Sequence, residues 1–167
     1  MIRTAICTCV ALVAMPAAAQ AQTRSPATVL MSEDERGRAV QERYGFSDAV
    51  IAGETIYLSG IVAGRAPGET SLTPAFERAF RHIGRILERA GAGYVDIVDM
   101  TSFHTDIVPE VDAMSQVQRR LLGSPPPAWT AIQVERLLPE NGIAEIKIVA
   151  RRRSAALPAP APAAGRD

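Results

Sequence analysis

The chain has 167 residues, which is enough for one domain and not comfortably for two. Its 18 basic and 18 acidic residues cancel, so we expect no nucleic-acid or membrane-surface partner, because such proteins normally carry a basic excess or stripe. Lys147 is the sole lysine, which leaves a single candidate for Schiff-base chemistry.

Residues 1–21 have the pattern of a secretory signal peptide. A basic start at Arg3 precedes an apolar run, Ala5–Met15, and small residues then offer cleavage sites after Ala19 or Ala21. The apolar run is too short to span a bilayer. We therefore expect an exported protein, periplasmic or secreted, with no membrane partner once the leader is removed.

Both cysteines, Cys7 and Cys9, lie in the leader, so the mature chain offers no disulfide and no thiolate ligand.

The segments between the leader and the predicted core, and after the core, have little apolar surface to bury. Residues 22–39 are polar, and we expect poor order there. Residues 154–167 repeat Ala and Pro and cannot offset their ordering entropy, which predicts a disordered tail. The foldable unit is then 40–153, a single domain.

Hydrophobic periodicity predicts two helices in this unit. The clearer one covers 72–90 and has an apolar stripe at helical spacing opposite a charged face. The second covers 109–122, with its buried side formed by Val111, Met114, Val117, Leu121 and Leu122. Short β-prone runs predict strands over 48–53, 55–61, 95–105, 129–138 and 143–152.

This order of elements predicts an α+β domain with a mixed β-sheet and two helices on one face. The strands carry apolar or mixed residues on both of their faces, for example Tyr57 and Ile132 as well as Ile146 and Ile148. Two helices suffice for one face of the sheet. We therefore expect the second face to be buried by self-association.

The usual signatures of metal, nucleotide and triad chemistry are missing from the sequence. His82 and His104 are the two histidines, and they lack the spacing of metal ligands, so we expect no metal and no cofactor. We expect His82 to be a solvated helix residue. For His104 we expect ordinary packing or a hydrogen bond within its strand.

One carboxylate has an unusual position. Glu145 interrupts the apolar last strand, and alternation places it with Lys147 on the face opposite Ile146 and Ile148. A half-buried carboxylate without a cation has a raised pKa, which suits a general acid or base. The alternative is that Glu145 pairs with an arginine on a neighbouring strand.

Four segments together resemble the RidA/YjgF family of reactive-intermediate deaminases, which is also called endoribonuclease L-PSP-like. They are DAVIAGETIYLSGIVAG (48–64), LERAGAG (87–93), VDIVDMTSFHTD (95–106) and PPPAWTAIQVERLLPENGIAEIKIVARR (125–152). The resemblance covers about Tyr44 to Arg152. It implies a chorismate-mutase-like fold, a homotrimer as the assembly, and a small-molecule ligand in clefts between subunits.

The resemblance also implies a set of site residues. The glutamate that positions the attacking water corresponds to Glu145. The aromatic residue before the first strand corresponds to Phe46, with Tyr44 as a competing position, and the Ser-Gly pair after the second strand is Ser59-Gly60.

The family arginine that binds the substrate carboxylate corresponds to Trp129. An indole has one N–H donor and no charge, so it cannot replace a guanidinium fork. Efficient hydrolysis of 2-imino acids is therefore not expected.

Three functions remain open at this point. The first is a RidA-like trimer that binds a small, less acidic ligand. The second is an imine or enamine deaminase that uses Glu145 together with another arginine, such as Arg65 or Arg136. The third is a non-catalytic structural or chaperone-like trimer, in which Trp129 packs at the subunit interface.

Overall fold

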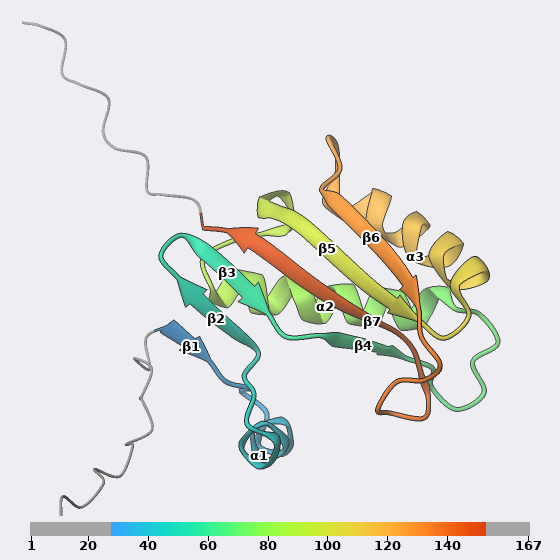
Figure 1. Ribbon diagram of the computed structural model, residues 1–167, viewed down its shortest axis with the longest axis horizontal. Helices are drawn as coiled ribbons and strands as arrows, with labels where there is room; N and C mark the ends of the chain where they lie inside the picture. The colour runs from blue at the N-terminus through green and yellow to red at the C-terminus, as the bar shows by residue number, and fades with distance from the viewer. Residues whose placement is uncertain (1–27, 153–167) are drawn as a thin grey trace, which may run out of the picture.

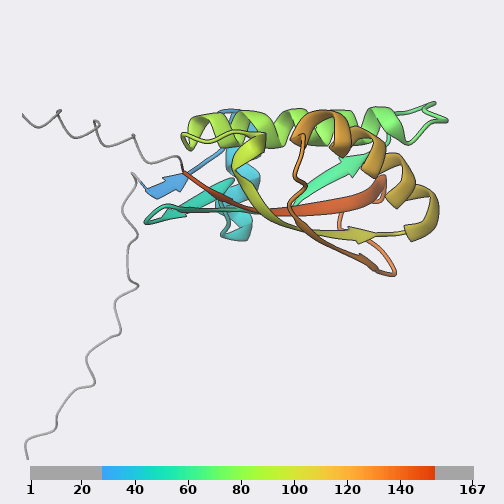
Figure 2. The ribbon, with the colours of Figure 1, turned by 90° about the horizontal axis from the view of Figure 1, so that it is seen from above.

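The computed structural model describes residues 28–152, so the predicted leader (1–21) and tail (154–167) lie outside the described residues. A seven-stranded sheet forms one layer, and two long helices pack side by side on one of its faces (Figures 1 and 2). The helices are α1 Glu35–Tyr44, α2 Thr73–Arg89 and α3 Ile107–Leu122, with a short 3-10 turn at Tyr94–Asp96. The strands are β1 Val29–Leu30, β2 Ala49–Ala52, β3 Thr55–Leu58, β4 Ile61–Gly64, β5 Ile97–His104, β6 Ala128–Gln133 and β7 Gly142–Arg151.

The long strand β7 organises the sheet, whose order is β1-β2-β3-β7-β5-β6. Both β3 and β4 pair antiparallel with β7, β3 at residues 149–151 and β4 at residues 142–146. On the other side β7 pairs antiparallel with β5, and β5 pairs parallel with β6. The parallel pair needs a crossover connection, which α3 supplies.

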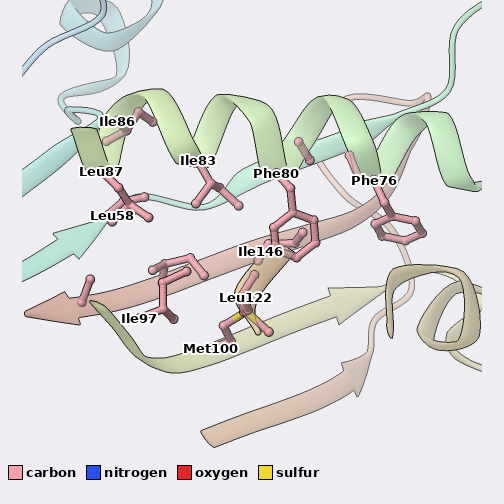
Figure 3. Packing of buried hydrophobic residues seen from close by; sticks show 14 of the residues in the cluster. Leu58, Phe76, Phe80, Ile83, Ile86, Leu87, Ile97, Met100, Leu122 and Ile146 are labelled. Atoms are coloured by element: carbon pink, nitrogen blue, oxygen red, sulfur yellow. The ribbon is translucent and has the colours of Figure 1, made fainter. Parts of the chain in front are cut away.

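The core lies between α2 and the sheet (Figure 3). Phe76, Phe80, Ile83 and Leu87 follow one another at helical spacing, and all four are fully buried. They pack toward the face of β7 that carries Ile146 and Ile148, both also fully buried. The periodicity that predicts the helix over 72–90 therefore also identifies the residues that hold the two layers together.

The expected layers are confirmed: the sheet is mixed, and two helices cover one face. Three expected strands differ in extent. The one expected over 95–105 begins at Ile97, after the 3-10 turn. The strand expected over 55–61 is divided into β3 and β4, and the one expected over 129–138 ends at Gln133. The chain leaves the sheet after Gln133, before the turn-forming residues Pro139, Asn141 and Gly142.

Residues 28–39 are ordered, contrary to the expectation of poor order over 22–39. Strand β1 pairs with β2, and α1 begins at Glu35 with the Asp34 side chain accepting a hydrogen bond from the Gly37 N–H. A polar network around buried Asp48 holds this segment against the domain. The Asp48 carboxylate accepts hydrogen bonds from Gln41 Nε2 at 2.6 Å and from Arg89 Nη1 at 2.9 Å. Hydrogen bonds and the packing of Leu30 against the core fix this segment, which has no apolar stripe that would have indicated it.

The face of the sheet opposite α2 and α3 carries apolar side chains that remain accessible in one chain. Tyr57 is 46% exposed and Ile132 is 44% exposed. Cross-strand register places Ile132 beside Phe103, and Phe103 beside Glu145. We refer to this surface as the open sheet face. It is the face on which the candidate carboxylate lies.

Candidate functional site

Two of the expected site residues line one hollow at the edge of the sheet. Phe46 and Ser59 border a hollow of about 360 Å³ where α1 ends and β2 begins. Gly45 ends α1 with φ 73°, a left-handed conformation that favours glycine, and this turn places Phe46 at the rim. The full lining is Val29, Met31, Gly45, Phe46, Ser47, Val50 and Ser59.

Ser59 fixes the chain between β3 and β4. Its hydroxyl donates to the Ser47 carbonyl at 2.6 Å, and its N–H donates to the Asp48 carbonyl at 3.0 Å. The hydroxyl proton is therefore already used within the chain. A ligand in the hollow would find Ser59 Oγ as an acceptor.

Glu145 packs directly against Gly60. A Cβ placed on Gly60 would overlap the Glu145 carboxylate, so the glycine provides the space in which this side chain lies. The cross-strand neighbours of Glu145 are Val62 and Phe103, so the alternative of an arginine partner on the next strand is wrong. Within residues 28–152 the Glu145 carboxylate makes no hydrogen bond and no ion pair. It is a half-buried carboxylate that remains available on the open sheet face.

The two aromatic candidates differ in position. Phe46 lines the hollow, whereas Tyr44 lies at the end of α1, is 59% exposed and is outside the lining. The Arg43 guanidinium lies over the Tyr44 ring, 5.3 Å from its centroid. Of the two, Phe46 is the one that the fold brings next to Ser59.

Trp129 is separated from this group. It pairs with Met100 across β5 and β6, on the helix-covered side of the sheet, whereas Glu145 pairs with Phe103 on the open side. The indole is half-buried, and its Nε1 donates to Ser102 Oγ at 2.9 Å. One chain therefore brings together Phe46, Ser59, Gly60 and Glu145, and it does not bring Trp129 to them.

A buried polar cluster under Trp129 is the feature that the sequence analysis missed. Ser102 Oγ lies 2.8 Å from His104 Nε2, and His104 Nδ1 lies 3.3 Å from Glu110 Oε2. Thr105 Oγ1 lies 3.0 Å from the other carboxylate oxygen of Glu110. Ser102 and His104 are fully buried, and Glu110 is 3% exposed.

Two patterns in the sequence place members of this cluster on buried faces, without showing that they meet. Ser102 and His104 alternate with Thr101 and Phe103 and so share the buried face of β5 with Met100. Glu110 precedes Met114 and Val117 at helical spacing, within the apolar stripe of α3. The buried side expected for this helix is wrong at two positions: Glu110 and Gln118 are buried, while Val111 and Leu121 are partly exposed.

The electrostatics of the cluster favour a neutral imidazole. Burial lowers the pKa of His104 below its ordinary value of 6.5, and the nearby Glu110 carboxylate opposes that shift. The contact between His104 Nδ1 and Glu110 Oε2 lacks the alignment of a well-formed hydrogen bond. Neither atom has another partner within the described part of the chain. Each is thus the other's only available partner.

The alternative arginines lie in other hollows. Arg65 lines one of about 710 Å³ together with Glu69 and Glu140, and Arg136 lines an adjacent one of about 430 Å³. The Arg78 guanidinium donates to Glu69 and lowers the pKa of that carboxyl to about 2, so Glu69 is ionised at neutral pH. The hollow with Arg65 therefore already contains anionic groups.

Within residues 28–152, no helix is long and apolar enough to cross a membrane. The same residues contain no group of three or more His, Cys, Asp or Glu side chains placed to hold a metal ion.

The fold is that of a single-domain α+β protein with a mixed sheet. The family model for Endoribonuclease L-PSP matches residues 37–152, so the chain belongs to this family. It is the same RidA/YjgF family that the sequence motifs resemble.

Individual relatives give the same assignment. The chain is 34% identical over 109 residues to the RutC family protein YjgH of Escherichia coli. This match covers 64% of the chain and 82% of the relative. It is 34% identical over 110 residues to the 2-iminobutanoate/2-iminopropanoate deaminase of Capra hircus, which covers 63% of this chain and 78% of the relative.

Solved structures agree in fold. The structure of YjgH superposes with a TM-score of 0.63 at 28% identity and covers 76% of this chain and 96% of its own. RidA from an Antarctic Psychrobacter superposes with a TM-score of 0.57 at 25% identity, with coverage of 78% and 99%.

Proposed function

We propose that the protein is a RidA-like homotrimer that binds a small ligand in clefts between its subunits and does not hydrolyse 2-imino acids efficiently. Glu145 supplies a hydrogen-bond acceptor or base in this cleft, and Phe46 and Ser59-Gly60 form the adjoining wall. Trp129 supplies an apolar wall where deaminases of the family carry a carboxylate-binding arginine.

The observation that carries the proposal is the unpaired carboxylate of Glu145. A half-buried carboxylate without a partner is costly unless a ligand or a neighbouring molecule uses it. The space that Gly60 leaves for it and the adjoining hollow at Ser59 are features of a prepared binding site.

Self-association is supported by the open sheet face. Antiparallel sheets commonly pack one face on a core and leave the other polar, yet here Tyr57 and Ile132 are accessible and apolar. Glu145 and Trp129 lie on opposite faces of one chain. A site that contains both therefore needs Glu145 from one copy and Trp129 from another.

The geometry of Trp129 argues against carboxylate binding. Its single N–H is already donated to Ser102, so the indole has no donor left for a ligand. Loss of a buried, charge-assisted carboxylate contact typically costs about 2–5 kcal/mol. At about 1.4 kcal/mol per tenfold change, substrate binding weakens by roughly 30-fold to several thousand-fold.

The second candidate is an imine deaminase that uses another arginine, and its support is the 34% identity to an imine deaminase. Arg65 borders a hollow of about 710 Å³, which it shares with Glu69 and Glu140. Carboxylates there disfavour an anionic substrate. The structural or chaperone-like trimer, as the third candidate, leaves the free Glu145 without a role.

The test is hydrolysis of 2-iminobutanoate, generated in the assay, by the wild type and by Trp129→Arg. We expect slow hydrolysis by the wild type and a gain of about 30-fold or more in kcat/KM for Trp129→Arg, because the guanidinium restores the carboxylate clamp. Trp129→Phe is the matched control and should give no gain. The gain should disappear in the double variant with Glu145→Gln.

Two results would contradict the proposal. Rapid hydrolysis by the wild type that depends on Arg65 would favour the second candidate. The absence of any gain in Trp129→Arg, with the trimer intact, would favour the structural trimer.

We also propose that the protein is exported by the leader over residues 1–21. Mass spectrometry of the protein from a periplasmic fraction should find a mature N-terminus at Gln20 or Gln22. An intact Met1 in the cytoplasmic fraction would contradict this.

A further inference from the structure

The Trp129 indole is the accessible end of a chain of polar side chains that runs into the core. From Trp129 Nε1 the chain passes through Ser102 Oγ (2.9 Å) to His104 Nε2 (2.8 Å), and from His104 Nδ1 to Glu110 Oε2 (3.3 Å). Ser102, His104 and Glu110 are buried, so the contacts that His104 makes with Ser102 and Glu110 are shielded from water.

The direction of every proton in this chain follows from the indole. An indole N–H only donates, so Ser102 Oγ accepts from Trp129 and its own proton is free for His104 Nε2. His104 Nε2 then accepts, which places the imidazole proton on Nδ1, facing the Glu110 carboxylate. The assignment rests on donor and acceptor capacity, and it requires a neutral His104.

We propose that Ser102, His104 and Glu110 are positioning residues that hold the Trp129 indole in a single orientation, with its N–H turned inward. The outward part of the ring is then purely apolar. This proposal rests on the function proposed above, and it narrows the ligand class to molecules that present an uncharged, apolar group to this wall.

The orientation depends on the charge of His104. An imidazolium would donate from Nε2 as well, so Ser102 Oγ would face two donors and its own proton would lose its acceptor. The charged group acting on His104 is Glu110 of α3. The neighbours across the sheet, Gln133 of β6 and Ala144 of β7, are uncharged, and the buried side of α2 is apolar.

The experiment uses the single tryptophan of the chain, which gives one indole N–H signal in the purified protein labelled with ¹⁵N-tryptophan. Ser102→Ala should shift this signal and speed its hydrogen exchange about tenfold, the change expected for loss of one hydrogen bond. Thr130→Ala is the matched control, because Thr130 is the exposed neighbour of Trp129 on the opposite face of β6. It should leave the signal unchanged.

Substitutions of His104 separate positioning from simple packing. His104→Gln retains an acceptor for Ser102 and a donor for Glu110, so it should preserve the wild-type signal, whereas His104→Leu should move it. In the wild type, the signal should shift with pH when His104 takes up a proton. The same pH-dependent shift in His104→Gln would overturn the proposal, as would an unchanged signal in Ser102→Ala.

The readout also distinguishes this inference from the proposed function. Suppose that Ser102→Ala moves the indole signal, and that the hydrolysis gain of Trp129→Arg and the trimer are both found as expected. The positioning of the indole is then supported by its own measurement. If wild-type hydrolysis already matches that of Trp129→Arg while the indole signal responds as expected, the proposed function fails and the positioning stands.

Discussion

Two carboxylates of this protein have opposite environments. Glu145 lies on the open sheet face, half-buried against Gly60 and without a partner among residues 28–152. Glu110 lies on the covered face, 3% exposed, between His104 and Thr105. The comparison shows that burial alone does not identify a reactive carboxylate. The partnered one stabilises an arrangement, whereas the unpartnered one is available for a ligand.

The largest expected change in the free energy of unfolding comes from the covered side of the sheet. His104→Leu removes the one polar contact that Glu110 Oε2 makes within residues 28–152 and should lower the free energy of unfolding by about 3 kcal/mol, as expected for an uncompensated buried carboxylate. Glu145→Leu, on the open side, removes a carboxylate that has no partner and should not lower the unfolding free energy of the dissociated chain. Urea unfolding of both variants measures the difference. Equal losses would show that the two carboxylates do not differ in the way described.

A smaller effect is expected at Gly60. In the Trp129→Arg background, Gly60→Ala should lower imine hydrolysis by about tenfold or more, because the new Cβ displaces the Glu145 carboxylate. The loss should be absent when Glu145 is already alanine, since the two substitutions then act on the same contact. A loss of the same size in both backgrounds would place the effect of Gly60 elsewhere.

The smallest effect is a dependence of stability on pH. The pKa of folded His104 lies below the unfolded value of 6.5, so the unfolded chain binds the extra proton first as the pH falls. Stability is therefore complete above about pH 6.5. It should decline below that pH by at most about 1.4 kcal/mol per pH unit. His104→Gln should remove this part of the slope, and a slope that is unchanged in this variant would contradict the assignment.

The residues of the open side could be predicted only in part from local patterns. Glu145 stands out in an apolar strand, and alternation with Ile146 and Ile148 predicts the face on which it lies. The grouping of Glu145 with Ser59-Gly60 came from the family resemblance, because the register between β4 and β7 cannot be read from either strand alone.

The covered cluster could not be predicted in the same way. Ser102 and His104 come from β5, Trp129 from β6 and Glu110 from α3, and only the parallel pairing of β5 with β6 brings them together. The order of residues 28–39 was missed for a similar reason, since it depends on contacts of Arg89 with Asp48 and Met31, far apart in the sequence.

The most direct test of the account is the mass of the purified protein in sedimentation equilibrium, because Glu145 and Trp129 share a site only when two copies meet. We expect a species of three chains, and Ile132→Asp on the open sheet face should dissociate it, whereas Val108→Asp on exposed α3 should not. A wild-type protein that sediments as a monomer would contradict the account.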